Sequence, residues 1–195
     1  MTPPISSDSQ PRPPRRWIEV ARIWLAAWIV GGALLGAGAL AVVEGGLFDA
    51  TATTQHSPLV AWAAHTAFLT SVRRRSGEAL PAQYGEAQVA AGFALYQSHC
   101  VMCHGGPGVA RADWVSGMNP APPYIIDAAR RFTAPQLYWV VSRGVKMTGM
   151  PAWRGVETPA QTWAVVTFLE SLPYLSPDDY RGLAAQRVRP AAPGN

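Results

Sequence analysis

Two cysteines and a histidine in one short segment carry the most distinctive chemistry of the chain. Cys100 and Cys103 are the only cysteines, two residues separate them, and His104 follows directly. One helical turn with this spacing can present both thiols to one porphyrin edge, where they add to the two vinyl groups, and can aim the imidazole at the iron. Cys-x-x-Cys-His is the attachment signature of a c-type haem. We therefore expect one haem c, covalently bound by Cys100 and Cys103, with His104 as an axial iron ligand.

Three other chemistries use similar residues but fit this segment less well. A disulfide between Cys100 and Cys103 would close a very short loop and stabilise little. A thioredoxin-type redox pair expects a βαβ context, which the sequence before Cys100 does not show. A zinc site needs four ligands, and this segment supplies three. Haem attachment is therefore the preferred interpretation.

The second axial position of the iron decides between electron transfer and ligand binding. Besides His104, the histidines and methionines that could fill it are His56, His65, His99, Met102, Met118, Met147 and Met150. His99 and Met102 adjoin or lie inside the attachment turn, so they stay on the proximal side of the ring. Met118 follows the motif closely, which makes its reach awkward. Met147 and Met150 lie in a loop with glycines and a proline, which could lay a thioether over a haem face.

An apolar segment without any charged residue runs from Ile23 to Val43. As a helix it would be about 31 Å long, close to the thickness of a bilayer's hydrocarbon core. Trp17, Trp24 and Trp28 cluster near its start, as interfacial aromatics do. A cleaved signal peptide is the alternative, but the apolar stretch and the region before it are both long for one. We expect an uncleaved transmembrane anchor at 23–43.

The distribution of charge gives this anchor an orientation. The net charge is +4, and the basic excess lies in residues 1–22 and in Arg187 and Arg189, whereas residues 85–181 are balanced. The central region is therefore not a cationic nucleic-acid binder. Because arginines precede the apolar segment and acids follow it, the N-terminus is expected in the cytoplasm and the rest of the chain in the periplasm. Covalent haem attachment in bacteria takes place in the same compartment.

The order of these features divides the chain into five parts. Residues 1–22 are rich in proline, serine and arginine, and we expect a disordered cytoplasmic tail. The transmembrane anchor at 23–43 and a periplasmic linker at 44–85 follow. The haem domain is expected over 86–181, and a second disordered tail over 182–195.

Within the linker, residues 58–75 have the features of a helix. Ser57 and Pro58 are an N-cap followed by proline at the first helical position. Apolar residues then recur at near-helical spacing, and Arg73 to Arg75 place positive charge where the helix dipole favours it. The apolar face would pack on the haem domain, the bilayer surface or a partner subunit, unless the helix is a plain spacer.

The haem domain shows helical patterns and no strand alternation. A helix at 86–99 leads into the motif, and residues 105–124, rich in glycine and proline, are expected to form an irregular loop. A short helix is predicted at 133–141. Thr158 and the proline after it begin a last helix that ends near Leu172. We therefore expect an all-α fold.

The whole pattern resembles class I cytochromes c. The resemblance rests on Cys-x-x-Cys-His-Gly, the proline-rich loop, the short helix, Thr-Gly-Met-Pro-Ala-Trp at 148–153 and the last helix. The pattern is most similar to the single-haem group that includes the haem subunits of cbb3-type oxidases, and it covers about residues 86–175. The resemblance implies three main helices around one covalent haem, here preceded by a transmembrane helix and a short extra helix.

The resemblance also implies a distal iron ligand. In that family the methionine before a proline fills this position, which selects Met150 and leaves Met147 as the lesser alternative. With His104 and Met150 both bound, the iron has no open site, and the protein is an electron carrier rather than an enzyme.

Two packing contacts follow from the same resemblance. Gly92 and a nearby aromatic residue are expected to meet the last helix; the residues concerned are Phe93 or Tyr96 on one side and Trp163 and Phe168 on the other. A carbonyl in the stretch 119–123 is expected to accept the proton on the far nitrogen of His104, which would orient the ligand.

These features predict a membrane-tethered periplasmic carrier that passes single electrons between respiratory or dehydrogenase proteins in or at the inner membrane. The alternative is a haem-bearing subunit of a larger oxidase or dehydrogenase complex, held through residues 44–84. A gas sensor or peroxidase with an open sixth site fits less well, because no distal histidine or arginine pocket can be identified. A second haem on His56 and His65 also fits poorly, because their spacing is unhelpful.

Overall fold

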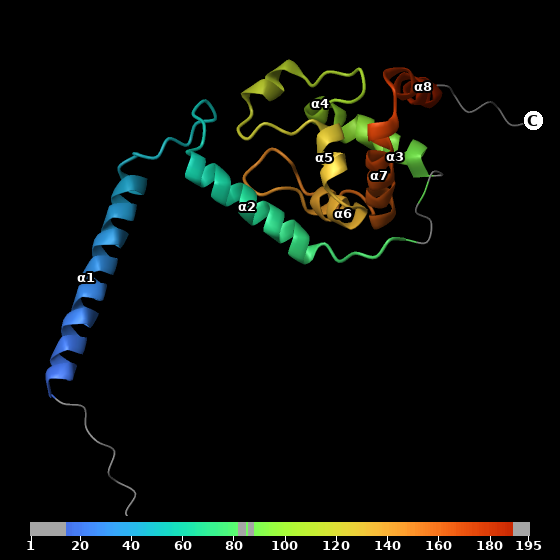
Figure 1. Ribbon diagram of the computed structural model, residues 1–195. Helices are drawn as coiled ribbons and strands as arrows, with labels where there is room; N and C mark the ends of the chain where they lie inside the picture. The colour runs from blue at the N-terminus through green and yellow to red at the C-terminus, as the bar shows by residue number, and fades with distance from the viewer. Residues whose placement is uncertain (1–14, 82–84, 86–87, 189–195) are drawn as a thin grey trace, which may run out of the picture. The chain divides into compact units, whose positions relative to one another are not determined.

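Helices are the regular elements in the part of the chain that the computed structural model describes, residues 15–81, 85 and 88–188 (Figure 1). Within these residues, extended structure is limited to isolated β-bridges. The expected all-α class is confirmed. The chain up to Thr51 and the chain from Ala52 onward form two compact units. The outer parts of the two expected disordered tails, 1–14 and 189–195, lie outside the described residues.

Helix α1, Arg15–Glu44, contains the whole apolar segment expected at 23–43. Its stretch Arg16–Glu44 is long and apolar enough to cross a membrane, and none of its most apolar window is buried. The helix begins earlier than expected, so residues 15–22 of the expected disordered tail are helical. This short segment contains neither glycine nor proline, which would interrupt a helix. It also continues the apolar surface of the helix toward the N-terminus, through Trp17, Ile18 and Val20.

Helix α2, Pro58–Arg75, has the bounds that the sequence predicted. The hydroxyl of Ser57 accepts a hydrogen bond from the backbone N–H of Val60, and a proline occupies the first turn. The last turn of the helix contains three arginines, whose positive charges interact favourably with the carboxyl end of the helix dipole.

The second half of α2 packs on the expected haem domain. Phe68 meets Phe132 edge to face, with ring centroids 6.2 Å apart, and Val72 is fully buried. Just beyond the helix, Glu78 pairs with Arg143 at 2.8 Å. The sequence left open whether the apolar face of α2 packs on the haem domain, the bilayer or a partner subunit. The structure shows that it packs on the haem domain.

The remaining helices build that domain. They are α3 Val89–His99, α4 Val101–His104, α5 Ile125–Arg131, α6 Ala134–Arg143, α7 Pro159–Ser171 and α8 Pro177–Val188, with the 3-10 turns η2 Asp113–Gly117 and η3 Leu172–Tyr174. Helices α3, α6 and α7 confirm those predicted from the sequence. Thr133 and Thr158 begin α6 and α7 through capping boxes, each followed by a proline in the first turn. The turn η2 lies inside the segment 105–124, which was expected to be irregular.

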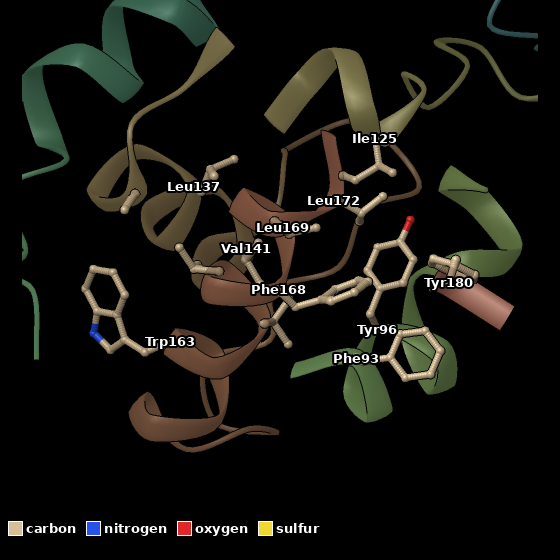
Figure 2. Packing of buried hydrophobic residues seen from close by; sticks show 13 residues of the cluster. Phe93, Tyr96, Ile125, Leu137, Val141, Trp163, Phe168, Leu169, Leu172 and Tyr180 are labelled. Carbon is tan, nitrogen blue, oxygen red and sulfur yellow. The ribbon is translucent and has the colours of Figure 1, made fainter. Parts of the chain in front are cut away.

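The centre of the core is the contact between α3 and α7 (Figure 2). A Cβ added at Gly92 would lie 1.9 Å from the carbonyl oxygen of Ala164, so only glycine lets the two backbones approach this closely. Phe93 and Tyr96 pack on Phe168, with ring centroids 5.4 and 5.2 Å away. The contact that the resemblance implied between Gly92, its aromatic neighbours and this helix is confirmed.

Helix α8 corrects the expected end of the domain. The sequence pattern predicted a disordered tail over 182–195, but the helix continues to Val188. The Ser176 hydroxyl accepts from the backbone N–H of Asp179, whose carboxylate accepts from the Ser176 N–H. Tyr180 is almost fully buried, with its ring 5.2 Å from that of Phe93. Further contacts with the core come from Leu183 and Ala184. A helix cap and these contacts outweigh the polar composition of the segment.

Candidate haem site

The attachment motif occupies the junction of α3 and α4. Cys100 lies between the helices, and the backbone N–H groups of Cys103 and His104 both donate to its carbonyl oxygen, at 3.1 and 3.0 Å. Both cysteines are free thiols and partly buried. Burial raises the pKa of Cys100 to about 12, with the charge of Cys103 the next cause. The Cys100 thiol is thus a neutral group in a partly buried setting.

His104 has one ring nitrogen engaged by the backbone. Its Nδ1 lies 2.9 Å from the carbonyl oxygen of Pro123, and because a carbonyl can only accept, Nδ1 is the protonated nitrogen. Desolvation by burial lowers the pKa of His104, the hydrogen bond to Pro123 opposes this, and the charge of Arg111 lowers it further. The imidazole is therefore neutral with Nε2 available, which is the form that binds a metal. The expectation of a carbonyl acceptor in the stretch 119–123 is confirmed, and the acceptor is Pro123.

Arg111 holds the loop around that acceptor. Its guanidinium donates to the carbonyl oxygen of Pro122 and lies over the ring of Tyr124, 4.0 Å from the centroid. Sequence reasoning missed this residue, because no motif marks a single arginine in an irregular loop.

Tyr96 fixes the other side of the attachment turn. Its hydroxyl donates to the carbonyl oxygen of Gly105, the residue that directly follows His104. Gly105 has a φ of 68°, a backbone conformation that favours glycine, and it ends α4. Burial raises the pKa of Tyr96 well above its usual range, so the hydroxyl keeps the proton that it donates. The sequence predicted Tyr96 as a packing residue but not this hydrogen bond.

The loop between α6 and α7 separates the two candidate methionines. The backbone N–H of Val145 donates to the Met150 carbonyl at 3.2 Å, and the Thr148 hydroxyl accepts from the Met150 N–H at 3.1 Å. Met150 is half-buried and packs against the same buried cluster as Cys100. Met147 has a φ of 60° and a side chain that is 90% exposed. The loop thus brings Met150, and not Met147, to the interior.

The other candidate ligands lie in different settings. His56 and His65 are exposed, and so is Met102. Met118 lies against Gly149, because a Cβ added there would be 2.1 Å from the Met118 methyl carbon. It therefore contacts the residue next to Met150.

The residues present fit a covalently bound haem. A c-type haem needs two thiols one turn apart, an imidazole with a free nitrogen and, for six-coordinate iron, a distal donor such as a thioether. Cys100, Cys103 and His104 would supply the thiols and the imidazole, and Met150 in the loop after α6 would supply the thioether. Over the described chain, no group of three or more histidine, cysteine, aspartate or glutamate side chains could hold a metal ion by itself. Two thiols, an imidazole and a thioether are donors that suit iron carried by a porphyrin.

Comparison with known families assigns this region. Residues 87–169 match the family model described as cytochrome C oxidase, cbb3-type, subunit III. This part of the chain is a cytochrome c domain of that family. A search of curated proteins finds no match. The family implies a covalent haem c and haem-based electron transfer, as the sequence resemblance did.

The cytochrome c domain has neighbours outside the matched region. Helix α2 precedes the match and α8 follows it, yet both pack on the domain through Val72 and Tyr180. The folded unit around the candidate haem site is therefore larger than the segment that carries the family pattern.

Proposed function

We propose that this protein is a membrane-tethered electron carrier with haem c bound covalently by Cys100 and Cys103 and ligated by His104 and Met150. The observation that carries the proposal is the neutral imidazole of His104, whose Nδ1 is bound to the Pro123 carbonyl. This contact leaves Nε2 for iron and fixes the plane of the ring. The cytochrome c family of residues 87–169 supports the same conclusion.

The difference in burial between the two loop methionines supports Met150 as the distal ligand. A thioether that binds iron is removed from solvent, and Met150 is half-buried whereas Met147 is almost fully exposed. A methionine ligand raises the reduction potential of the iron, and a haem with both axial positions filled binds no substrate. When bound, the haem supplies one-electron chemistry; the chain holds the ligands and excludes water from them.

Helix α1 supports a location at the bacterial inner membrane. Its apolar residues are exposed, and its charged residues precede Ile23 or follow Val43. We propose that it spans the membrane uncleaved, with the N-terminus in the cytoplasm and the cytochrome c domain in the periplasm. Electron donors and acceptors are then redox proteins in or at the same membrane.

A stable subunit of a larger oxidase or dehydrogenase complex is the second candidate. The first half of α2 favours it, because Leu59, Val60 and Trp62 are exposed although they are apolar. Blue-native electrophoresis of native membranes separates the two candidates. Migration as a large complex favours the subunit, whereas migration as a small species favours the free carrier.

Optical spectra of the purified holoprotein test the proposed ligation. A pyridine haemochrome assay should give one c-type haem per chain. The ferric protein should show the weak far-red band of methionine-ligated iron, and the ferrous protein should bind carbon monoxide slowly. A missing band together with rapid carbon monoxide binding would instead assign the open-site alternative, a gas sensor or peroxidase.

A further inference from the structure

A close contact between a histidine and a carboxylate joins the residue before the attachment motif to the segment that follows Met150. His99 directly precedes Cys100, and its Nε2 lies 3.1 Å from a carboxylate oxygen of Glu157, which follows Met150 along the chain. The His99 side chain is 32% exposed and that of Glu157 is 12% exposed. The contact is therefore partly shielded from solvent, where an ion pair or charge-assisted hydrogen bond is stronger than at the surface.

Trp153 adds an aromatic contact to this pair. Its ring lies against the His99 ring, with centroids 4.5 Å apart and planes tilted by 39°. The Trp153 carbonyl accepts the backbone N–H of Glu157 at 2.9 Å, so both residues belong to one hydrogen-bonded turn. His99 therefore contacts that turn through a ring and a carboxylate together.

The same turn is held to α6 by the backbone. The N–H of Trp153 donates to the carbonyl of Val141 at 3.4 Å, and the N–H of Arg154 donates to that of Ser142 at 2.7 Å. The end of the Met150 loop thus has one connection to α6 and another, through His99, to the attachment motif.

This contact also lies beside the first haem-attaching cysteine. His99, Cys100, Trp153 and Glu157 line one small pocket. The carboxylate of Glu157 is close enough to contribute to the raised pKa of Cys100. Cys100, which would be bonded to the haem, therefore lies beside residues that follow Met150 along the chain.

We propose that His99, Trp153 and Glu157 are positioning residues that hold the Met150 loop against the haem-attachment turn. The inference rests on the proposed ligation by His104 and Met150. A loop fixed at one end to the segment that binds the haem has fewer conformations in which the thioether is away from iron. These three residues would thereby set how often the Met150–iron bond opens.

Kinetics of carbon monoxide binding to the ferrous holoprotein test this role, because carbon monoxide binds only when the thioether has left the iron. We expect Glu157→Ala to raise the binding rate about fivefold and His99→Ala to raise it at least as much, because His99→Ala also removes the Trp153 ring contact. The double variant should raise the rate no further than His99→Ala alone, because the Glu157 contact is made to His99. Glu157→Gln keeps an oxygen that can accept from His99 and should recover most of the wild-type rate. The far-red ferric band should weaken in the two alanine variants.

Asp178→Ala is the matched control, since it removes another carboxylate and its ion pair with Arg181 on α8. It should leave the rate unchanged. Unchanged rates in both alanine variants, or effects that multiply in the double variant, would overturn the inference. If His99→Ala takes up no haem, the carbon monoxide binding rates of Glu157→Ala and Glu157→Gln are compared, and this comparison alone tests the inference. A wild-type protein that lacks the far-red band and binds carbon monoxide rapidly would show that the ligation itself is wrong.

Discussion

At the residue scale, backbone carbonyls position the attachment turn and its imidazole. Pro123 accepts from the ring of His104, and Gly105 accepts from the hydroxyl of Tyr96. Both donors are neutral groups that burial keeps in the right protonation state, since the pKa of His104 is lowered and that of Tyr96 is raised. The local fold thus determines both the orientation and the charge of the His104 imidazole.

Replacing the buried loop methionine should open the distal position. We expect Met150→Ala to abolish the far-red ferric band, lower the reduction potential and let carbon monoxide bind the ferrous haem rapidly, because the thioether ligand is gone. Optical titration and potentiometry measure these changes. Met147→Ala is the control and should leave all three properties unchanged. Loss of the band in the Met147 variant alone would make Met147 the ligand.

Gly92 should be the least replaceable glycine of the core. A Cβ at this position would lie 1.9 Å from the Ala164 carbonyl oxygen, so Gly92→Ala must push α3 away from α7. We expect a loss of about 1–3 kcal/mol or more in the free energy of unfolding, measured with denaturant. Gly182→Ala on α8 meets no atom within 4 Å and should be neutral or stabilising by about 0.5–1 kcal/mol. Equal effects of the two changes would contradict the close approach.

The motif predicts haem-attachment residues, but it does not predict the groups that hold them. Cys100, Cys103 and His104 are adjacent in sequence, so their spacing alone carries the chemistry. The Pro123 acceptor is 19 residues from His104, and only its approximate stretch was predictable. The contact between His99 and Glu157 joins distant segments and depends on how the Met150 loop folds back. Such pairs leave no local pattern.

At the scale of elements, α2 is part of the folded cytochrome unit although the family pattern begins after it. Its fully buried Val72 and the edge-to-face pair of Phe68 and Phe132 lie on the side of α6. The helix therefore contributes to the stability of the domain that carries the candidate haem site.

A matched pair of valines tests this contribution. Val72→Ala should lower the free energy of unfolding of the holoprotein by about 1–3 kcal/mol, because it leaves a cavity in a closed contact. Val60→Ala makes the same chemical change on the exposed half of α2 and should stay within about 0.5 kcal/mol of wild type. Denaturant unfolding followed by fluorescence measures both. Similar values for the two variants would mean that α2 does not pack on the domain in solution.

The helix starts that the sequence placed most accurately are those with strong start signals. A capping residue followed by proline placed the starts of α2 and α7 correctly. The same signal at Ser176 and Pro177 begins α8, but the polar composition of that segment favoured a disordered tail, and the burial of Tyr180 is a tertiary effect. Helix α5 has no side-chain cap and only seven residues, so packing rather than local sequence determines it.

At the scale of the whole molecule, the chain separates an apolar helix from a folded unit. The unit from Ala52 onward has its own core, and α1 contributes no residue to that buried cluster. We therefore expect the two parts to have separable tasks, with α1 determining the location of the protein and the rest of the chain forming the redox site.

Exchange of residues 1–43 for a cleavable export signal should release a water-soluble holoprotein with an unchanged ferric spectrum and reduction potential. The native chain should stay in the membrane pellet after a high-salt and carbonate wash, because α1 is long and apolar enough to span the bilayer. Membrane fractionation and N-terminal sequencing measure both outcomes. A native chain recovered in the soluble fraction and cut after α1 would make that helix a signal sequence.

The Asn119 amide donates a hydrogen bond to the carbonyl of Thr54, at 2.8 Å, within the unit that begins at Ala52. Asn119 belongs to the same short stretch as Pro123, whose carbonyl orients His104. The segment before α2 is thus fastened to the stretch whose carbonyl orients the His104 imidazole.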